Sequence, residues 1–414
     1  MPTQKRTRGR RIGGRVGLIL VGILVALVLM EVGLRVAVCR VAGNLTPMFR
    51  RVQVSPLPEG SHPVLNHGLL LEKQFISTGA PPGSEFLVQH NVSRNGMLDD
   101  PVPNPRAAGE LRVLVLGDSF VEARQVPMEA NFCERLQMRL TRELERPVHV
   151  INGGVSSYSP ILSYLQYSRY LRWVRPQVVL HVLFSNDAYD DLRYAQLATH
   201  DDEQRPLAVK PGVLFVQVDP DPVLAQQATD HRIAQAQLLH GIPVGLARFS
   251  YTASQLQYMI RGWRYKRMYP QRPPNEEFFI LNGDPRLTRM QVMAKQLLVK
   301  HVGLLKDACE NDGAQYMLSS APLSAQIYGR SKKSYFSLGF EVTEADHALA
   351  VATAKELGVR YVDLRPPLRA GGKGLYYPRD GHWTPKGHAV VAEALYPAIL
   401  EALQISLEDP EASR

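Results

Sequence analysis

Five short apolar runs, each bounded by turn residues, constrain the fold of this 414-residue chain more than any other feature. They are too uniformly apolar for strands with one face in water, so we expect buried strands. Helix-like stretches lie between them, at 129–145 and 289–311. Strands that alternate with helices predict a parallel sheet covered on both faces. The runs are "LRVLVLG" (111–117), "VHVINGG" (148–154), "QVVLHVLFS" (177–185), "AQYMLSSAPL" (314–323) and "VRYVDLRPPL" (359–368).

A basic head followed by an apolar stretch opens the chain. Residues 1–15 contain six lysines and arginines and no acid, and Val16 to Leu34 then form a 19-residue run interrupted by Glu31. About 20 such residues cross the hydrocarbon of a bilayer as a helix. Residues 1–40 are therefore predicted to form a cytoplasmic basic head and a transmembrane anchor, with the basic side inside. The alternative is a cleaved signal peptide, although no good small-x-small cleavage site follows.

This anchor places the rest of the chain outside the cytoplasm. We expect a single-pass protein of the bacterial inner membrane, with its folded domain in the periplasm or outside the cell. The formal net charge of +9 comes mostly from the first fifteen residues. It therefore indicates no basic patch on a folded domain, and nucleic acid is not an expected partner.

The three cysteines are Cys39, Cys133 and Cys309. No two of them have the spacing of metal ligands, and no metal site is predicted. Cys133 and Cys309 could form a disulfide in an oxidising compartment, or both could be buried free thiols. The sequence leaves these two alternatives open.

Two regions interrupt the alternation of strands and helices. Residues 41–110 are rich in proline and poor in periodicity, which predicts a linker and lead-in segment that packs loosely. Residues 192–288 are predicted to be an insertion after the third strand of a domain spanning 111–405. Within it, a hairpin is expected over 205–218 with its turn at Pro211-Gly212, followed by a helical segment at 244–268.

Chemically useful side chains follow four of the predicted strands. Ser119 follows the first, the stretch 152–157 ends the second, and 185–187 ends the third, while Asp380 and His382 follow the fifth after a glycine-rich loop. Ligands of open parallel sheets bind beyond the carboxyl ends of the strands. The sheet is therefore predicted to bring these segments together.

Asp380 and His382 precede a strong helix start. Thr384 can cap a helix, and Pro385 suits its first position. A carboxylate two residues before an imidazole in the preceding turn can accept its Nδ1–H and leave Nε2 free. His382 is thus predicted to be a general base oriented by Asp380, which would activate the otherwise weak nucleophile Ser119.

A developing oxyanion needs hydrogen-bond donors. The candidates are the backbone N–H of Ser119, a backbone N–H of the 153–157 loop, and the side-chain amide of Asn186. Nearby groups have more structural interpretations. Asp118 and Asp187 are expected to support their own turns, and His388 is expected to be structural.

Trp383, beside the predicted base, has two interpretations. Its indole could stack on a sugar, or it could pack next to the catalytic turn. The sequence does not decide between these roles.

These motifs resemble the SGNH, or GDSL, hydrolase family. "GDSF" (117–120) is similar to its first block, "NGGVSS" (152–157) to its second, "SND" (185–187) to its third and "DGH" (380–382) to its last. Ser157 and Ser185 stand where the family usually carries glycine.

The resemblance implies a flavodoxin-like three-layer α/β/α fold with a five-stranded parallel sheet. It also implies a catalytic set of Ser119, His382 and Asp380. The implied oxyanion hole is formed by Ser119, Gly154, Ser157 and Asn186.

The expected activity is a serine ester hydrolase that forms an acyl-enzyme and needs neither metal nor organic cofactor. Its substrate would be a small-molecule, lipid or glycan ester, such as an acetylated glycan or lipid of the cell envelope. One alternative is an O-acyltransferase that uses the same residues to acetylate a glycan. Another is a non-catalytic envelope-binding module on an inactive scaffold. The sequence does not determine the oligomeric state.

Overall fold

The computed structural model describes residues 5–42, 59–69, 71–72, 74–79, 85–210, 285–329 and 344–408. The chain divides into two compact units, one containing helix α1 (Lys5–Ala42) and the other containing the large sheet and its helices. The turn predicted at Pro211-Gly212, the second arm of that hairpin and the helical segment 244–268 lie outside the described residues.

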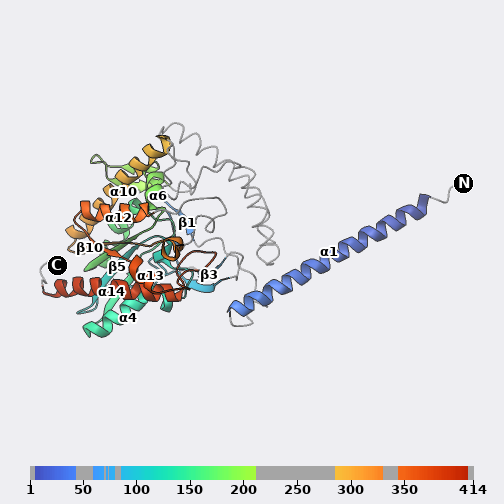
Figure 1. Cartoon of the computed structure of the whole chain (residues 1–414), viewed down its shortest axis with the longest axis horizontal. Coiled ribbons are helices and arrows are strands. Elements are labelled where there is room, and N and C mark those ends of the chain that lie inside the picture. The colour runs from blue at the N-terminus through green and yellow to red at the C-terminus, as the bar shows by residue number, and fades with distance from the viewer. Residues whose placement is uncertain are drawn as a thin grey trace. The chain divides into compact units, whose positions relative to one another are not determined.

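A five-stranded parallel sheet forms the centre of the larger unit (Figure 1). Its strand order is β11-β10-β7-β5-β6, which confirms the predicted fold class. Every residue of β5 and of β7 is buried, which explains why the sequence showed continuous apolar runs rather than alternation. The strands are β5 (Leu111–Gly117), β6 (Val148–Asn152), β7 (Val178–Leu183), β10 (Gln315–Ser320) and β11 (Arg360–Asp363).

Helices cover both faces of this sheet and create two cores. Alternate side chains of β5 enter each core, Val113 on one face and Leu114 on the other. The first face packs against α4 (Phe132–Leu144), α13 (Arg365–Ala370) and α14 (Pro385–Glu408). The second packs against α6 (Asp187–Ala195), α10 (Pro285–Asn311) and α12 (Ala345–Glu356). Two neighbours of the second layer are α5 (Pro160–Gln166) and the single π-helical turn η2 (Tyr167–Leu171).

Short elements complete the described chain. Among the described residues, three small sheets of two strands each are separate from the main sheet. They pair β1 (Glu59–His62) with β2 (Asn66–Leu69), β3 (Gln74–Thr78) with β4 (Leu87–Asn91), and β8 (Ala198–His200) with β9 (Pro206–Val209). The short helices are α3 (Ser119–Glu122), α11 (Ser324–Tyr328), η1 (Met128–Ala130) and η3 (Arg172–Val174).

The lead-in segment packs tightly, so the prediction of loose packing is wrong for its described part. Leu65, Met97 and Val102 are at most 6% exposed. Met97 and Val102 belong to the core under the second face of the sheet. The prolines disrupt the hydrophobic periodicity of this segment, but its apolar side chains are still buried. An extended chain can bury single side chains without a repeating hydrophobic pattern.

The described arm of the predicted hairpin also pairs with a strand that the sequence did not indicate. The strand β9 pairs with β8, which precedes it, through contacts such as Ala198 opposite Val209. Sequence reasoning joined 206–209 to the residues after Pro211-Gly212, because that dipeptide is a strong turn signal. The pairing with a preceding strand carried no comparable signal.

The fifth strand is shorter than predicted and ends at Asp363. The helix α13 begins at Arg365, where Pro366 and Pro367 occupy its first turn. Proline has no N–H for a strand ladder but is tolerated at the start of a helix. The Asp363 carboxylate accepts the backbone N–H of Arg365 at 2.9 Å and so stabilises this helix start.

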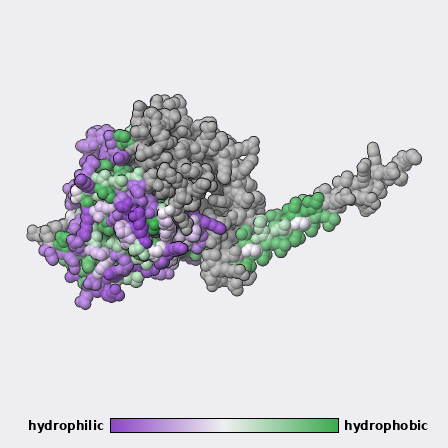
Figure 2. Space-filling model, viewed as in Figure 1, coloured by the Kyte–Doolittle hydropathy of each residue, from purple (hydrophilic) through white to green (hydrophobic). Residues whose placement is uncertain are grey.

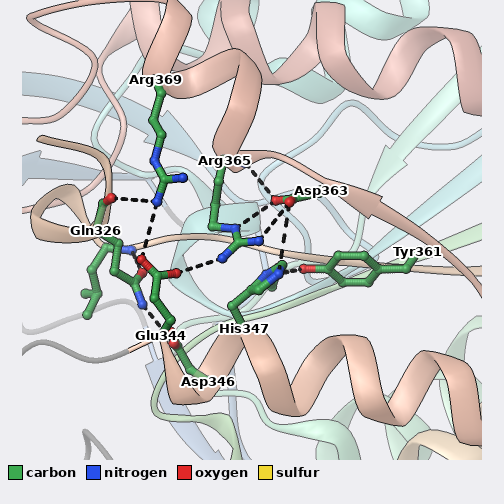
Figure 3. Close-up of polar contacts among 10 residues, drawn as sticks. Gln326, Glu344, Asp346, His347, Tyr361, Asp363, Arg365 and Arg369 are labelled. Carbon is green, nitrogen blue, oxygen red and sulfur yellow. Dashed lines mark hydrogen bonds and ion pairs between the residues drawn. The ribbon is translucent and has the colours of Figure 1, made fainter. Parts of the chain in front are cut away.

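Ion pairs at this strand end connect α13 with the beginning of α12, as Figure 3 shows. The Arg365 guanidinium donates to Asp363 at 2.9 Å and to Glu344 at 2.7 Å. Arg369 donates to the backbone oxygen of Gln326 at 3.1 Å. Hydrogen bonds from Arg365 outweigh the effect of burial and hold the pKa of Asp363 below its usual value. The cluster therefore joins three segments that lie beside the edge strand.

The helix α1 contains the predicted N-terminal apolar segment. Residues Gly17–Val36 have a mean hydropathy of 2.6 over a length sufficient to cross a membrane. Apolar side chains cover the surface of this part of α1 (Figure 2), and Leu18 is 75% exposed. Glu31, the acid within the run, pairs with Arg35 one turn later at 2.8 Å. The helix α14 is also long and apolar, but its buried side chains belong to the core of the larger unit.

Cys133 and Cys309 are buried free thiols. Cys133 lies in the core under the first face of the sheet and Cys309 in the core under the second. Of the two alternatives that the sequence allowed, the structure therefore has the unpaired one.

The start of α14 leaves no room for a side chain at Gly387. A Cβ there would lie 2.2 Å from the carbonyl oxygen of Leu375, whereas a Cβ at Gly303 in α10 would make only an ordinary contact at 3.5 Å. We expect Gly387→Ala to lower the free energy of unfolding by about 1–3 kcal/mol. Gly303→Ala should raise it by up to about 1 kcal/mol, because alanine favours a helix. Chemical denaturation measures both, and equal effects would contradict this account.

Candidate active site

Ser119 begins the short helix α3, directly after the interior strand β5, which lies between β7 and β6. Gly117 ends the strand, where a Cβ would lie 2.6 Å from the backbone oxygen of Val182 on β7. The Asp118 carboxylate then accepts the N–H of Phe120 at 3.0 Å and caps the helix. The tight strand-to-helix turn thus places the Ser119 side chain at the carboxyl edge of the sheet.

The structure brings Ser119, His382 and Asp380 together. The Ser119 hydroxyl lies 2.7 Å from Nε2 of His382, and Nδ1 of the same ring lies 2.7 Å from Oδ1 of Asp380. The His382 backbone N–H also donates to Asp380, at 3.2 Å. Thr384 accepts the N–H of Gly387 at 3.2 Å, so it caps α14 as its sequence position predicted. These bonds fix the turn that carries the carboxylate and the imidazole.

The Asp380 carboxylate is suited to orient the imidazole. Burial acts to raise its pKa, but hydrogen bonds and charge from His382, together with the charge of Arg124, hold the pKa below its ordinary value. An ionised carboxylate only accepts hydrogen bonds, so Nδ1 of His382 is the donor and Nε2 is free to accept the Ser119 proton. This is the protonation pattern that a general base requires.

Aromatic side chains pack against the imidazole. The Phe120 ring lies 4.7 Å from the ring of His382 and 4.7 Å from that of Trp383, measured between centroids. Trp383 has no exposed surface, so it packs in the core and does not stack on a sugar as one interpretation proposed. His388 is also buried and stacks on Phe132, in agreement with the predicted structural role. The imidazole of His382 therefore packs against buried aromatic side chains.

The loop after β6 lies beside the nucleophile turn. The N–H of Val155 donates to the carbonyl of Gly117 at 3.2 Å. A Cβ on Gly154 would lie 2.3 Å from the backbone nitrogen of Glu122 in α3. The Gly154 N–H itself donates to Oδ1 of Asn152 at 3.0 Å. Gly154 therefore permits close approach of two backbones rather than offering the oxyanion donor that the sequence predicted, because its N–H is already used.

The other two backbone candidates remain available. Within the described part of the chain, the N–H groups of Ser119 and Ser157 have no hydrogen-bond acceptor. Ser157 has φ +61°, the left-handed conformation that glycine adopts most readily. The serine that departs from the usual family residue thus keeps the backbone conformation suited to glycine.

Asn186 begins α6 at the end of β7. Its side-chain amide donates one hydrogen to Asp190 at 2.8 Å and has a second N–H. The ring of the neighbouring Phe184 lies 4.6 Å from the ring of Phe120, measured between centroids. This contact places the loop beside the nucleophile turn. This second N–H is the third donor candidate of the site.

The two neighbouring acids support their own turns, as predicted. Asp187 accepts the backbone N–H of Phe184 at 2.9 Å, just as Asp118 caps α3. Burial raises the pKa of Asp118 to about 6 and that of Asp187 well above its ordinary value. Their mutual repulsion also raises the pKa of Asp187, because both carboxyl groups are buried near each other.

Sequence reasoning missed the residues that bind the loop after β6, here called the second-block loop (residues 152–157). Asp99 accepts the N–H of Asn152 at 2.7 Å, and His67 lies 2.8 Å from the backbone oxygen of Ser156. The buried Glu122 carboxylate accepts the Ser156 hydroxyl. His67 and Asp99 come from the lead-in segment, where no motif marked them. The only signal for Glu122 was its place one helical turn after Ser119.

Among the described residues, no cluster of three or more histidine, cysteine, aspartate or glutamate side chains could hold a metal ion.

Comparisons with known proteins find similarity in part of the chain. Residues 289–413 match the family described as "SGNH hydrolase-like domain, acetyltransferase AlgX". A probable alginate O-acetylase AlgJ from Pseudomonas putida is 31% identical over 113 residues, which cover 26% of this chain and 28% of that protein. The chain thus spans less than a third of this relative. The family match includes Asp380 and His382 but not Ser119.

Three solved structures are similar at low sequence identity. They are TesA (14% identity, 70% of this chain and 99% of that one, TM-score 0.37), the acetyl xylan esterase AlAXEase (10%, 70% and 100%, 0.38) and a GDSL-like lipase from Bacteroides thetaiotaomicron (10%, 70% and 88%, 0.33). The family match and the five-stranded parallel sheet agree with the motifs at the strand ends. Residues 289–413 are thus similar to an SGNH hydrolase-like domain, and the motifs at the strand ends resemble those of SGNH, or GDSL, hydrolases.

Proposed function

We propose that this chain is a serine enzyme that cleaves esters through an acyl-enzyme on Ser119. The observation that carries the proposal is the continuous hydrogen-bond chain from the Ser119 hydroxyl through His382 to Asp380, with both links at 2.7 Å. A serine hydroxyl becomes nucleophilic when a positioned base takes its proton.

The reaction has two steps, acylation of Ser119 and hydrolysis of the acyl-enzyme. Nε2 of His382 takes the Ser119 proton while Oγ bonds to the ester carbonyl carbon, and the carbonyl oxygen becomes an oxyanion. The intermediate then breaks its bond to the alcohol oxygen, which receives the proton from His382. Water next gives its proton to His382 and attacks the acyl carbon, and the free acid leaves as Ser119 regains its proton.

Three donors are proposed for the oxyanion: the N–H groups of Ser119 and Ser157 and the side-chain amide of Asn186. The two backbone groups have no other acceptor in the described structure, and Asn186 keeps one N–H beyond its bond to Asp190. Donors arranged before the reaction stabilise the developing charge without reorganisation.

Acetyl transfer to a glycan is the second candidate function. The matching family and the Pseudomonas putida relative are both described as acetylating proteins. In this version a sugar hydroxyl of an exopolysaccharide replaces water in the second half of the reaction. The same three residues serve both outcomes, because the acyl-enzyme is common to them.

We further propose that α1 anchors the enzyme in the inner membrane and that the catalytic domain acts in the periplasm or outside the cell. The apolar length of Gly17–Val36 and the basic residues before it support this arrangement. The proposed divisions are 1–40 for the anchor, 41–110 for the lead-in and 111–405 for the catalytic domain. The substrate would be a small-molecule, lipid or glycan ester of the envelope.

A fluorophosphonate probe tests the nucleophile. We expect the full-length protein in detergent to be labelled on Ser119, because the probe reacts with serines activated by a base. Ser119→Ala should take up no label, whereas Ser156→Ala should still be labelled. Mass spectrometry of the labelled peptide identifies the site, and label at another serine would contradict the proposal.

The fate of the acyl group separates the two candidate functions. The full-length protein would be given an acetyl ester with and without an added polysaccharide acceptor. Release of free acetate at the same rate in both reactions supports hydrolysis. Transfer to the polysaccharide that exceeds acetate release supports the transferase instead, and loss of both products in Ser119→Ala is the control.

Activity should decline toward acidic pH, because a protonated imidazole cannot act as a base. The pKa of Asp380 lies below its ordinary value, so its carboxylate stays ionised through this range and does not cause the decline. Burial raises the pKa of Asp118 to about 6, so Asp118→Asn is the necessary control and should retain the decline. A flat kcat/KM profile from pH 5 to 8 would argue against His382 as the base.

Asn186→Ala tests the third oxyanion donor. Loss of one such donor typically lowers kcat about a hundredfold or more, with little change in KM. Steady-state kinetics on p-nitrophenyl acetate measures this effect. A change below about threefold would exclude the Asn186 amide from the oxyanion hole.

A further inference from the structure

The peptide unit between Ser156 and Ser157 is held from its carbonyl side. Nε2 of His67 lies 2.8 Å from the Ser156 oxygen. A carbonyl oxygen only accepts hydrogen bonds, so the imidazole is the donor. In a trans peptide the C=O and the following N–H point in opposite directions within one plane. The imidazole on the oxygen therefore determines where the Ser157 N–H points.

The His67 ring is itself held in place. It is 5% exposed, and the ring of Tyr158 meets it edge-on at 5.2 Å between centroids. The Tyr158 hydroxyl donates to the backbone oxygen of His67 at 2.9 Å. Nδ1 of the ring lies 3.1 Å from Oδ1 of the buried Asn66, so both ring nitrogens have a polar neighbour. Burial is the main cause that lowers the pKa of His67.

The same serine is held through its side chain. The Ser156 hydroxyl donates to Glu122, whose side chain is completely buried and belongs to the helix that Ser119 begins. Ser156 is thus fixed at its carbonyl by the lead-in segment and at its hydroxyl by the nucleophile helix. Such support is needed because Ser157 has a left-handed backbone conformation that is unfavourable for a residue with a Cβ.

We propose that His67 is a positioning residue of the oxyanion hole, which aims the Ser157 N–H at the carbonyl oxygen of the substrate through its hydrogen bond to Ser156. This inference rests on the proposed acyl-enzyme function, and it assigns a role in catalysis to the lead-in segment. A hydrogen bond to the oxygen of an amide also polarises it, which makes its N–H a better donor.

Two substitutions of His67 separate its hydrogen bond from its packing. His67→Phe keeps a ring of similar size against Tyr158 but removes the donor. His67→Gln restores an N–H at about the position of Nε2. His181→Gln is the matched control, because this buried histidine bonds the Tyr316 hydroxyl at 2.8 Å, and Tyr316 is not among the residues of the proposed site.

Steady-state kinetics of the full-length variants on p-nitrophenyl acetate is the first measurement. We expect His67→Phe to lower kcat about tenfold or more with KM within about twofold, because an oxyanion donor acts in the transition state. His67→Gln should recover most of the loss. His181→Gln should lower the melting temperature without this loss of kcat. Equal kcat in His67→Phe and the wild type, or equal losses in His67→Phe and His67→Gln, would overturn the proposal.

Amide hydrogen exchange of residues 153–158 gives a second measurement that does not depend on activity. Exchange should be faster in His67→Phe than in His67→Gln and the wild type, and equal exchange in all three would overturn the proposed positioning. A wild-type protein that neither cleaves the ester nor takes up a fluorophosphonate would instead refute the acyl-enzyme function. The exchange comparison would then still decide whether His67 holds the loop.

Discussion

The hydrogen bond between the Ser119 hydroxyl and Nε2 of His382 is the contact on which the proposed chemistry depends. It joins residues separated by 263 positions, which only the parallel sheet brings to one edge. Ser119 follows the interior strand β5, whereas His382 lies in the turn before α14, a helix packed on one face of the same sheet. The packing of α14 on the sheet is therefore what brings the base to the nucleophile.

Buried polar groups around this contact are stabilised mainly by backbone donors and by one another. Asp118 and Asp187 each accept a backbone N–H at the end of a strand. Asp380 accepts the backbone N–H and the Nδ1–H of His382. A buried carboxylate without such partners would be costly. The aromatic rings under His382 add rigidity, because close-packed side chains leave the imidazole little freedom. The site thus combines buried aromatic side chains with three carboxylates that each accept at least one hydrogen bond.

The lead-in segment has a larger role than its composition indicated. Asp99 and His67 hold opposite ends of the second-block loop, and His90 bonds the backbone oxygen of Arg124 just after the nucleophile helix at 2.8 Å. Each contact is made by one polar side chain on otherwise irregular chain. Such contacts produce no periodic pattern in the sequence. A prediction from hydrophobic periodicity therefore assigns the segment as a linker. In the folded molecule it supports the backbone that carries the proposed donors.

The sequence by itself determined the sheet, its order of elements and the residues of the proposed triad. Buried strands, the Thr384 helix cap and the acid two residues before His382 are local features, and local geometry follows from neighbouring residues. Only the tertiary structure decided that Trp383 is buried, that Gly154 serves close packing, that Cys133 and Cys309 stay apart, and that His67 reaches Ser156. These outcomes depend on which surfaces meet in space, and distance along the chain carries no information about that.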